Sequence, residues 1–356
     1  MKEKFTRPQI KEFVHFFPLN KNEYQIRIGE DDFVYKLKGE SADYLTKILP
    51  YLNGKYTIKE IISKTRLNRK IVSLVLDKLK DFLIDAETIN KRKYRKFRDQ
   101  INFFSLWSKK PMVMQKMITD SVICVVNYGN LAFEMIESLY ASGFQKIFVC
   151  DDSRALKENR FLSATKIYKK DSKQRIYLND KKICEKITLI VVCMDAFDPS
   201  FCEEVNEFAV TTEKPCFFLR KNGVASGIVG PLVVPFLTAC FKCLDLRIKA
   251  NLDFYDEYIA YENYLRKKRV NKDTPCLKSL DKVLANLAIM EIIKYITGFE
   301  SPITFSRYLI VNQIDFSFET HDVLKLPRCP VCGVREDSFR LPWLEPIAEV
   351  YSDKND

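Results

Sequence analysis

The stretch "SVICVVNYGNLAFEMIESLYASGFQKIFVCDDS", residues 121–153, decides the fold predicted for the larger part of this chain. An apolar run from Val122 to Val126 is followed by a turn, an amphipathic helix and a second strand ending at Asp151-Asp152. This order is typical of a nucleotide-binding fold, whose first turn normally needs several glycines so that the backbone can approach phosphate. Only Gly129 remains here. The sequence therefore predicts the scaffold and leaves its chemistry in question.

Strand and helix patterns continue to alternate beyond this stretch. "ITLIVVCMD", residues 187–195, and "KPCFFLR", residues 214–220, are continuous apolar runs of the buried-strand type. "SLDKVLANLAIMEIIKYITG", residues 279–298, is a long apolar helix that Gly298 stops. Together these patterns predict an α/β domain with a mostly parallel sheet and crossover helices.

Two cysteine pairs form the strongest motif of the chain. "TACFKCLDLR" supplies Cys240 and Cys243, and "LPRCPVCG" supplies Cys329 and Cys332. Each pair is C-x2-C, and four thiolates at this spacing fit a tetrahedral zinc site. Because no open ligand position is apparent, we expect the zinc to be structural and to couple metal binding to folding. A thioredoxin-type redox pair and unligated core cysteines are the alternatives.

The other seven cysteines lie mostly in predicted strands and are interpreted as small apolar core residues. Cys276, in the polar loop "NKDTPCLKS", is the exception. It is a candidate nucleophile, but His15 and His321, the only two histidines, lie far from it in sequence. We therefore expect an inert loop cysteine.

Length and composition indicate a soluble two-domain protein. A chain of 356 residues exceeds the size at which one core usually stops growing, and 47% hydrophobic residues can fill real cores. No apolar run approaches the roughly 20 residues of a membrane helix. The start, "MKEKFTRPQIKEF", has no signal-peptide apolar stretch. We therefore expect a cytoplasmic location, reduced thiols and no membrane partner.

The net charge of +11 is concentrated near the N-terminus. Residues 1–110 hold 25 Lys+Arg and 14 Asp+Glu, and the remainder holds 33 of each. Such a domain suits an acidic partner, either nucleic acid or an acidic peptide. A lysine-rich but merely solvated surface is the plain alternative. The run "NKRKYRKFRDQ" predicts that residues 91–117 form a basic linker.

Residues 1–90 predict a winged-helix-like domain of three strands and three helices. "EYQIRIG" and "DFVYKLKG" flank a turn and form a hairpin, with "FVHFF" as a partner strand. Ser41, Thr57 and Asn68 are the expected N-caps of three helices, with Glu60 at a capping-box position. The third helix is expected to be "RKIVSLVLDKLKDFLI", residues 69–84.

This third helix carries more apolar surface than one core face requires. Its second apolar stripe, beside the hairpin strand, predicts a groove in which an extended peptide adds as a strand. Packing of that stripe against the second domain is the alternative. The expected core stripe is Ile71, Leu74, Val75, Leu79 and Phe82, and the expected peptide-binding residues are Phe33, Val34, Tyr35, Lys36, Leu37, Lys38, Arg69, Val72, Ser73, Leu76, Lys80 and Leu83.

A winged helix with Arg69, Lys70, Lys78 and Lys80 also raises the hypothesis of DNA binding. Acidic residues stand among these cations, and the helix is unusually apolar for one that enters a major groove. A nucleic-acid partner is therefore not expected.

Three segments resemble the ThiF-like branch of the ubiquitin-activating-enzyme superfamily. They are "GIVGPLVVPFLTACFKCLDLRI", "LANLAIMEIIKYITG" and "VLKLPRCPVCG". More narrowly, the chain resembles the "ocin-ThiF" proteins of thiazole/oxazole-modified microcin, bacteriocin and thiopeptide pathways. The N-terminal part, with "YLNGKYTIKEI" between its helices, resembles the leader-peptide recognition element of ribosomally made, modified peptides. The resemblance spans nearly the whole chain.

This resemblance implies a non-catalytic partner protein with a doubly wound Rossmann-type domain at residues 118–356. Such proteins bind the leader of a precursor peptide and deliver its core to a separate YcaO-type cyclodehydratase, which forms azolines. A flavin dehydrogenase then usually oxidises these rings. Leaders of this class are often acidic, which suits the basic N-terminal third. A homodimer is left open.

The resemblance also implies which residues would serve adenylation. Asp151 or Asp152 stands where an acidic residue binds ribose, and "KENRFL" keeps Arg160 but replaces the glutamine of an "NRQ" segment by Phe161. Asp195 matches the metal-binding aspartate in position. An ATP-dependent enzyme that activates a peptide or carrier-protein terminus is therefore the alternative function.

The turn "NYGNLA" argues against that alternative. Asn127 and Tyr128 stand where glycines would let backbone N–H groups face phosphates. We therefore expect no ATP binding and no catalytic residues. The remaining positions are interpreted as a vestigial nucleotide site, made of Gly129, Asp151, Arg160 and Asp195.

Overall fold

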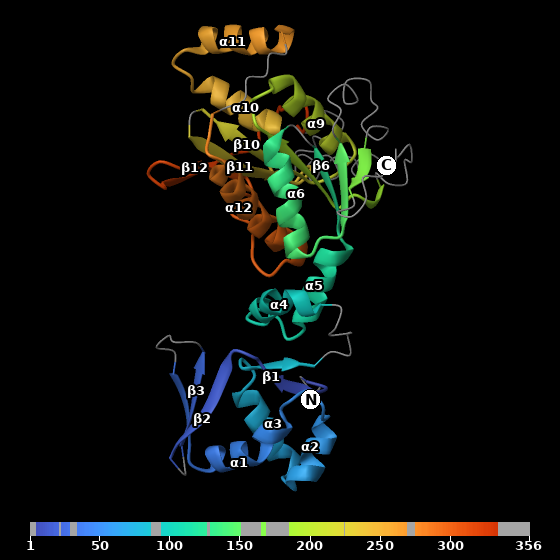
Figure 1. Ribbon diagram of the computed structural model, residues 1–356, viewed down its shortest axis with the longest axis vertical. Coiled ribbons are helices and arrows are strands. Elements are labelled where there is room, and N and C mark those ends of the chain that lie inside the picture. Colours follow the sequence, from blue (N-terminus) through green and yellow to red (C-terminus); the bar gives the residue numbers. More distant parts are fainter. Residues whose placement is uncertain are drawn as a thin grey trace, which may run out of the picture. The chain divides into compact units, whose positions relative to one another are not determined.

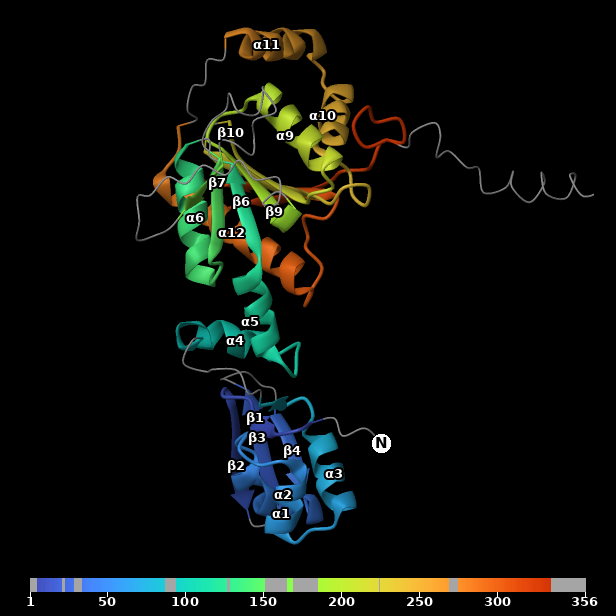
Figure 2. The same cartoon turned by 90° about the vertical axis from the view of Figure 1, so that its right-hand side faces the viewer.

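The computed structural model describes residues 5–20, 23–28, 34–86, 94–126, 129–150, 165–168, 185–223, 225–268 and 275–333. The chain divides into two compact units. Unit 1 comprises Met1–Thr119 and Thr297–Phe299, and unit 2 comprises Asp120–Ile296 and Glu300–Asp356. Figures 1 and 2 show both units, coloured along the sequence.

Unit 1 contains the predicted winged-helix-like arrangement of strands and helices, which is confirmed. A three-stranded antiparallel sheet, in the order β2-β3-β4, lies beside three helices (Figure 2). A second, two-stranded ribbon pairs β1 with β5. The strands are β1 (Pro8–Ile10), β2 (Val14–Asn20), β3 (Glu23–Ile28), β4 (Val34–Lys38) and β5 (Leu83–Asp85); the helices are α1 (Glu40–Ile48), a 3-10 turn at Leu49–Tyr51, α2 (Ile58–Thr65) and α3 (Arg69–Lys78).

Helix starts in unit 1 follow local side-chain chemistry. Thr57 and Glu60 form a reciprocal capping box at the start of α2, and Asn68 accepts the Lys70 N–H at 3.0 Å at the start of α3. Both predicted caps are confirmed. The prediction for Ser41 is wrong, because α1 already begins at Glu40. Gly39, at φ 62°, turns the chain there in a conformation that favours glycine.

The segment predicted to be a basic linker, residues 91–117, is largely helical where it is described. It holds a 3-10 turn at Arg95–Phe97, helix α4 (Arg98–Phe104) and most of helix α5 (Pro111–Asp120). Aromatic residues spaced among the basic ones explain the difference. Tyr94, Phe97 and Phe104 are buried, and Phe299 contacts Phe103, Phe104 and Trp107. Their burial offsets the charge run that suggested a solvated connector.

Unit 2 is built on an eight-stranded sheet in the order β13-β12-β11-β10-β9-β6-β7-β8 (Figure 1). The neighbours β7, β6, β9 and β10 are parallel, and every other pair is antiparallel. The predicted Rossmann-type α/β fold is therefore confirmed, but the sheet is mixed and not mostly parallel as predicted, because antiparallel strands extend the parallel block on both sides. The strands are β6 (Val122–Val126), β7 (Lys146–Cys150), β8 (Thr165–Tyr168), β9 (Leu189–Met194), β10 (Cys216–Asn222), β11 (Ser226–Val233), β12 (Arg307–Asn312) and β13 (Phe318–Asp322).

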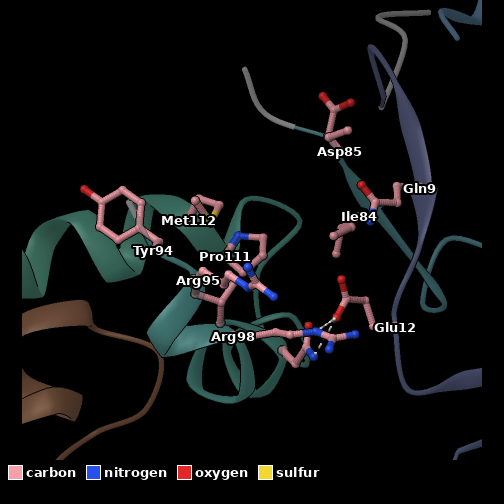
Figure 3. A pocket seen from close by; sticks show the side chains of 12 residues that line it. Gln9, Glu12, Ile84, Asp85, Tyr94, Arg95, Arg98, Pro111 and Met112 are labelled. Atoms are coloured by element: carbon pink, nitrogen blue, oxygen red, sulfur yellow. Dashed lines mark hydrogen bonds and ion pairs between the residues drawn. The ribbon is translucent and has the colours of Figure 1, made fainter. Parts of the chain in front are cut away.

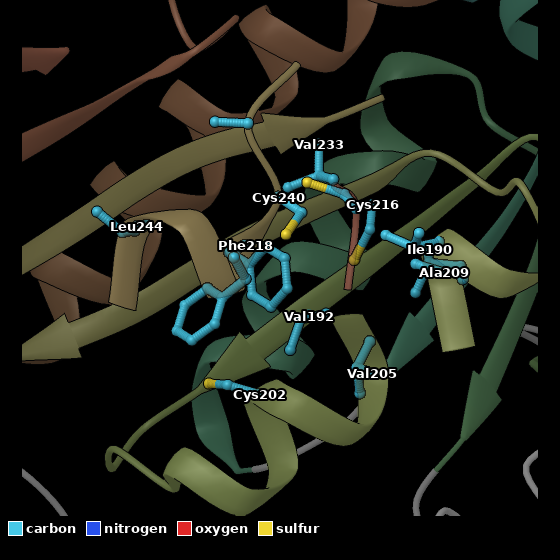
Figure 4. Packing of buried hydrophobic residues seen from close by; sticks show 14 of the residues in the cluster. Ile190, Val192, Cys202, Val205, Ala209, Cys216, Phe218, Val233, Cys240 and Leu244 are labelled. Carbon is cyan, nitrogen blue, oxygen red and sulfur yellow. The ribbon is translucent and has the colours of Figure 1, made fainter. Parts of the chain in front are cut away.

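Helices cover the two faces of this sheet. On one face, α6 and α12 lie near each other, and Lys278 pairs with Glu134 at 3.7 Å. On the other face, α9 and α10 cover the buried side chains of β9 and β10, including Val192, Phe218 and Cys216 (Figure 4). The helices are α6 (Asn130–Ser142), α9 (Pro199–Thr211), α10 (Phe241–Ala250), α11 (Tyr255–Lys268) and α12 (Lys278–Thr297). In the described part of the chain, no helix has both the length and the apolar character needed to span a bilayer.

Candidate functional site

Four cysteine side chains meet at one point of unit 2. Cys240 and Cys243 come from the start of α10, and Cys329 and Cys332 come from the segment after β13. All four are buried, and their sulfur atoms lie within 4.8 Å of one another. The measured Sγ–Sγ distances are 3.8 Å for Cys240–Cys243, 3.6 Å for Cys240–Cys329 and 3.4 Å for Cys243–Cys332.

These distances fit a tetrahedral metal site. Zinc–sulfur bonds of about 2.3 Å imply tetrahedral sulfur–sulfur edges of about 3.8 Å. The Leu326 N–H donates to Cys243 Sγ at 3.4 Å, and hydrogen bonds from Cys240 and Cys332 lower the pKa of Cys243. Both effects favour the thiolate form of Cys243, which is the form that binds metal. The cluster can therefore hold a metal ion such as zinc.

The remaining described cysteines are of a different kind. Cys124, Cys193, Cys202 and Cys216 are buried in the apolar core, and burial raises the pKa of the Cys193 and Cys202 thiols. Cys276 is partly exposed and lies 3.9 Å from an oxygen of Asp281. This contact is with a carboxylate and not with a histidine, so among the described residues the geometry gives no histidine base for a cysteine nucleophile.

A carboxylate of the protein itself lies at the N-terminus of α6, the first helix of the Rossmann-type domain. Gly129 lies at the N-terminus of α6 with φ 118°, and the Asp195 carboxylate contacts it so closely that a Cβ could not fit between them. Asp195 Oδ2 accepts the Leu131 N–H at 3.3 Å. A helix N-terminus attracts anions, and this one already has one.

A buried lysine neutralises the same carboxylate. Lys221, on β10, forms an ion pair with Asp195 and a second one with Asp281 of α12 at 3.1 Å. All three side chains are almost fully buried. Burial alone would lower the pKa of Lys221, but hydrogen bonds to Asp195 and Asp281 raise it above its usual value. Lys221 is therefore the cation that neutralises Asp195 here, at the position that the resemblance relates to a metal-binding aspartate.

The other residues of the predicted vestigial site cannot be compared with this geometry. These residues, Asp151 and Arg160, lie outside the described residues, as do Asn127 and Tyr128 of the turn and Asp152. Of the predicted set, the structure brings together Gly129 and Asp195. Sequence reasoning did not identify Lys221 and Asp281, because they come from distant elements and match no local motif.

The structure contradicts the predicted second apolar stripe of α3. Val72, Leu76 and Leu83 are at most 4% exposed and belong to the core of unit 1 itself, so they do not line a surface groove. Leu83 moreover lies in β5, because the helix ends at Lys78. Leu74, expected in the core, is instead 53% exposed. The helix therefore has a wide apolar arc, but the side chain of that arc that faces solvent is Leu74, and Val72 and Leu76 face the core.

A surface beside β4 nevertheless remains open. In the described part of the sheet, β4 pairs only with β3, so its other edge has no strand partner. Tyr35 is exposed on β4, and the centre of its ring lies 5.7 Å from the centre of the Phe82 ring, which follows α3. Lys78 of α3 donates to Ser41, just after β4, at 2.8 Å, and Leu74 lies one helical turn before Lys78 on the same face.

The polar side chains predicted to bind a peptide along this edge are exposed to solvent. Lys36, Lys38, Arg69, Ser73 and Lys80 are exposed, and Leu37 is buried in the core. Lys36 and Lys38 lie 4.0 and 3.5 Å from Glu23 across the sheet, and such exposed pairs are weak. Phe33 lies outside the described residues, and the side chain of Val34 is not described.

A cavity of about 200 Å³ lies within unit 1, between the β1–β5 ribbon and helices α4 and α5 (Figure 3). Arg98 crosses to Glu12, with 2.6 Å between Arg98 Nε and Glu12 Oε2. The lining carries charges of both signs, including Glu12, Asp85, Arg95 and Arg98. This balance favours no single class of ligand, and no sequence motif pointed to the cavity.

Comparisons with known proteins agree with both units. Residues 32–84 match the family model for the C-terminal HTH of GATOR1 complex protein NPRL3. Protein HesA of Leptolyngbya boryana is 26% identical over 144 residues, which are 40% of this chain and 43% of HesA. The chain thus spans less than half the length of this curated relative.

Solved structures with the same fold cover 92% of this chain. The heterocyclase TruD has a TM-score of 0.66 and 19% identity, and the match covers 43% of the TruD chain. Escherichia coli MccB with succinimide has a TM-score of 0.59 and 17% identity, matched over 100% of its chain. MccB with ATP has a TM-score of 0.56 and 18% identity. The resemblance predicted from the sequence is confirmed as a likeness of fold.

Proposed function

We propose that this chain binds the leader of a ribosomally made precursor peptide and presents the peptide core to a separate YcaO-type cyclodehydratase, which closes azoline rings. The likeness to a 43% portion of the heterocyclase TruD supports this proposal. The portion of TruD without a counterpart here would correspond to the separate cyclodehydratase. A flavin dehydrogenase would act after ring closure.

The observation that carries the proposal is the open edge of β4. A leader in an extended conformation would add antiparallel or parallel to β4 through main-chain hydrogen bonds. Its apolar side chains would contact Tyr35 and Leu74, which are 38% and 53% exposed. An acidic leader would meet the exposed cations Lys36, Arg69 and Lys80.

The chain would contribute no catalytic residue of its own. Asp195, the residue expected at the metal position, is already neutralised by Lys221 and fills the N-terminus of α6. The four-cysteine cluster would hold a structural zinc ion, since all four positions of a tetrahedron are taken by thiolates. We therefore regard the Rossmann-type domain as a scaffold.

Fluorescence polarisation with a labelled precursor leader tests the proposal. We expect a dissociation constant of about 1 µM or lower for the full chain. Leu74→Glu places a charge on the contact surface and is expected to weaken binding at least tenfold. Leu106→Glu is the matched control, because Leu106 is 47% exposed on unit 1 and follows α4, outside both β4 and α3.

Two outcomes would count against leader binding at this edge. One is a cognate leader that does not bind, and the other is equal weakening by Leu74→Glu and Leu106→Glu. Binding should also weaken as salt rises, because the exposed lysines and arginines are screened.

The competing function is ATP-dependent activation of a peptide terminus. The likeness of fold to MccB, which was solved with ATP, is the observation that favours it. It requires ATP–pyrophosphate exchange by the purified chain. Exchange that is lost in Asp195→Ala would establish this enzyme function and replace our proposal of a non-catalytic scaffold.

A further inference from the structure

Arg220 lies at the carboxyl end of β10, where it pairs with Met194 of β9 and Ile228 of β11. Side chains alternate along a strand, so Arg220 shares the sheet face of Phe218. Its guanidinium carbon lies 4.9 Å from the centre of the Phe197 ring. Such stacking leaves the N–H edge of a guanidinium free to bind a partner.

Among the described residues, three cations of the helices on this side of the sheet, Lys242, Lys249 and Arg266, are neutralised by carboxylates. They form one network that joins α9, α10 and α11, with three cations and three carboxylates. Its contacts are Lys242 with Glu203 and Asp245 at 2.8 Å each, Lys249 with Asp245 at 2.9 Å and Glu262 at 2.8 Å, and Arg266 with Glu203 at 2.6 Å and Glu262 at 3.5 Å. This network is electrically balanced without Arg220.

Arg220 has no such counter-ion in the part of the chain that the structure describes. Beyond the Phe197 ring, its electrostatic neighbours are Cys202, Tyr258 and Tyr308, and burial lowers its pKa. Even partial burial of an unpaired charge is costly, so this position favours an anion from outside. Arg220, Phe197, Tyr258 and Tyr308 are all partly exposed, so a ligand can reach them.

We infer that Arg220, with Phe197, Tyr258 and Tyr308, binds a single carboxylate group of a peptide. One guanidinium neutralises one negative charge and can donate two parallel hydrogen bonds to a planar carboxylate. The stacked Phe197 ring suits the apolar chain that carries the carboxylate, and Tyr258 and Tyr308, within electrostatic range of Arg220, carry phenol groups able to donate hydrogen bonds. A phosphate dianion would leave one negative charge without a partner.

This inference does not depend on leader binding at β4, because the two surfaces belong to different units of the chain. The carboxylate could be a peptide C-terminus or the side chain of Asp or Glu. Both sources offer the same chemistry, and synthetic peptides separate them.

The test is a titration of the full chain followed by NMR of the arginine Nε–H groups. Three N-acetylated tripeptides serve as probes: Gly-Ala-Leu with a free C-terminus, the same peptide amidated, and amidated Gly-Glu-Leu. The Arg220 signal is identified by its loss in Arg220→Lys. If that variant does not fold, Phe197→Leu identifies the signal through the loss of the stacked ring.

We expect a saturable shift of the Arg220 signal with a dissociation constant on the order of 1 mM for a peptide that carries a carboxylate. A shift with the free C-terminus, with the glutamate peptide, or with both supports the inference and names the source. Arg247, whose Nε donates to the Leu324 carbonyl at 2.6 Å, is the control signal and should not move.

Three results would overturn the inference. The first is no shift with either carboxylate peptide at about 20 mM, some twentyfold above the expected dissociation constant. The second is an equal shift with the amidated Gly-Ala-Leu peptide. The third is tighter binding of inorganic phosphate than of both carboxylate peptides.

Discussion

The carboxylate of Asp195 lies directly against Gly129 at the N-terminus of α6. Its Oδ2 accepts the backbone N–H of Leu131 in the same helix, and its Oδ1 forms the ion pair with Lys221. A bound phosphate would have to displace this internal anion and separate it from a buried cation. The contact gives a physical reason, beyond the missing glycines, for expecting a scaffold at this turn.

Replacing Gly129 by alanine should strongly destabilise unit 2. The residue has φ 118°, which alanine rarely adopts, and an added Cβ would collide with Asp195. We expect a loss of roughly 2–4 kcal/mol in the free energy of unfolding, measured by urea titration. Gly223→Ala is the matched control, because Gly223 also has positive φ but open space around it, and should lose only about 1 kcal/mol.

Removing one cysteine of the cluster should remove the metal. We expect about one zinc ion per chain by elemental analysis, and almost none in Cys329→Ser, together with loss of the folded state of unit 2. Cys202→Ser keeps all four ligands and should retain the metal, since Cys202 is a buried core cysteine outside the cluster. A fully folded, metal-free wild-type chain would disprove the zinc assignment.

The ion network beneath α11 should make stability depend on pH. Burial raises the pKa of Glu203, but hydrogen bonds from Arg266 and Lys242 outweigh it and lower that pKa overall. A lowered carboxyl pKa stabilises the fold above the unfolded value of about 4.3, and this contribution is lost as pH falls through the folded value. Glu203→Gln should therefore cost roughly 1–2 kcal/mol at pH 7 and progressively less as pH falls below about 4 toward the lowered pKa of Glu203.

Urea titrations at several pH values measure this difference between wild type and Glu203→Gln. Glu207→Gln on the same helix is the control, because Glu207 is exposed and outside the network. An effect of Glu203→Gln that stays constant from pH 7 to pH 3.5 would show that its carboxylate is not the stabilising group.

Val72 and Leu74 of α3 should respond differently to truncation. Val72 is 0% exposed, so Val72→Ala should lower the free energy of unfolding of unit 1 by roughly 1.5–3 kcal/mol. Leu74 is 53% exposed, and Leu74→Ala should change it by less than about 0.5 kcal/mol. Calorimetry of the full chain follows the unit 1 transition. Equal effects at the two positions would contradict the orientation of α3.

Local chemistry explains which features the sequence could predict. The C-x2-C spacing holds each cysteine pair on one turn, and the caps at Thr57 and Asn68 act within three residues. Alternating apolar runs likewise predict strands and helices without knowledge of their neighbours. The prediction that the two cysteine pairs meet rested on the preference of zinc for four ligands.

Features that depend on long-range packing could not be predicted in this way. The apolar arc of α3 is wide, and its sequence does not indicate which side of the arc faces the core. The position of β5 and the end of the helix at Lys78 determine that side. Lys221 meets Asp281 across 60 residues of sequence, through the pairing of a strand with a helix that covers it. The many basic residues of the segment suggested a solvated linker, so the spacing of aromatic residues that predicts helix α4 was not recognised.

The two cysteine pairs also divide the aromatic cluster around Arg220. Tyr258 and Tyr308 lie in the stretch between Cys243 and Cys329, whereas Phe197 and Arg220 precede it. A metal ion would close that stretch into a loop, and loop closure reduces the conformational freedom of everything inside it. Availability of zinc would thereby govern how well one half of a carboxylate-binding surface is held against the other.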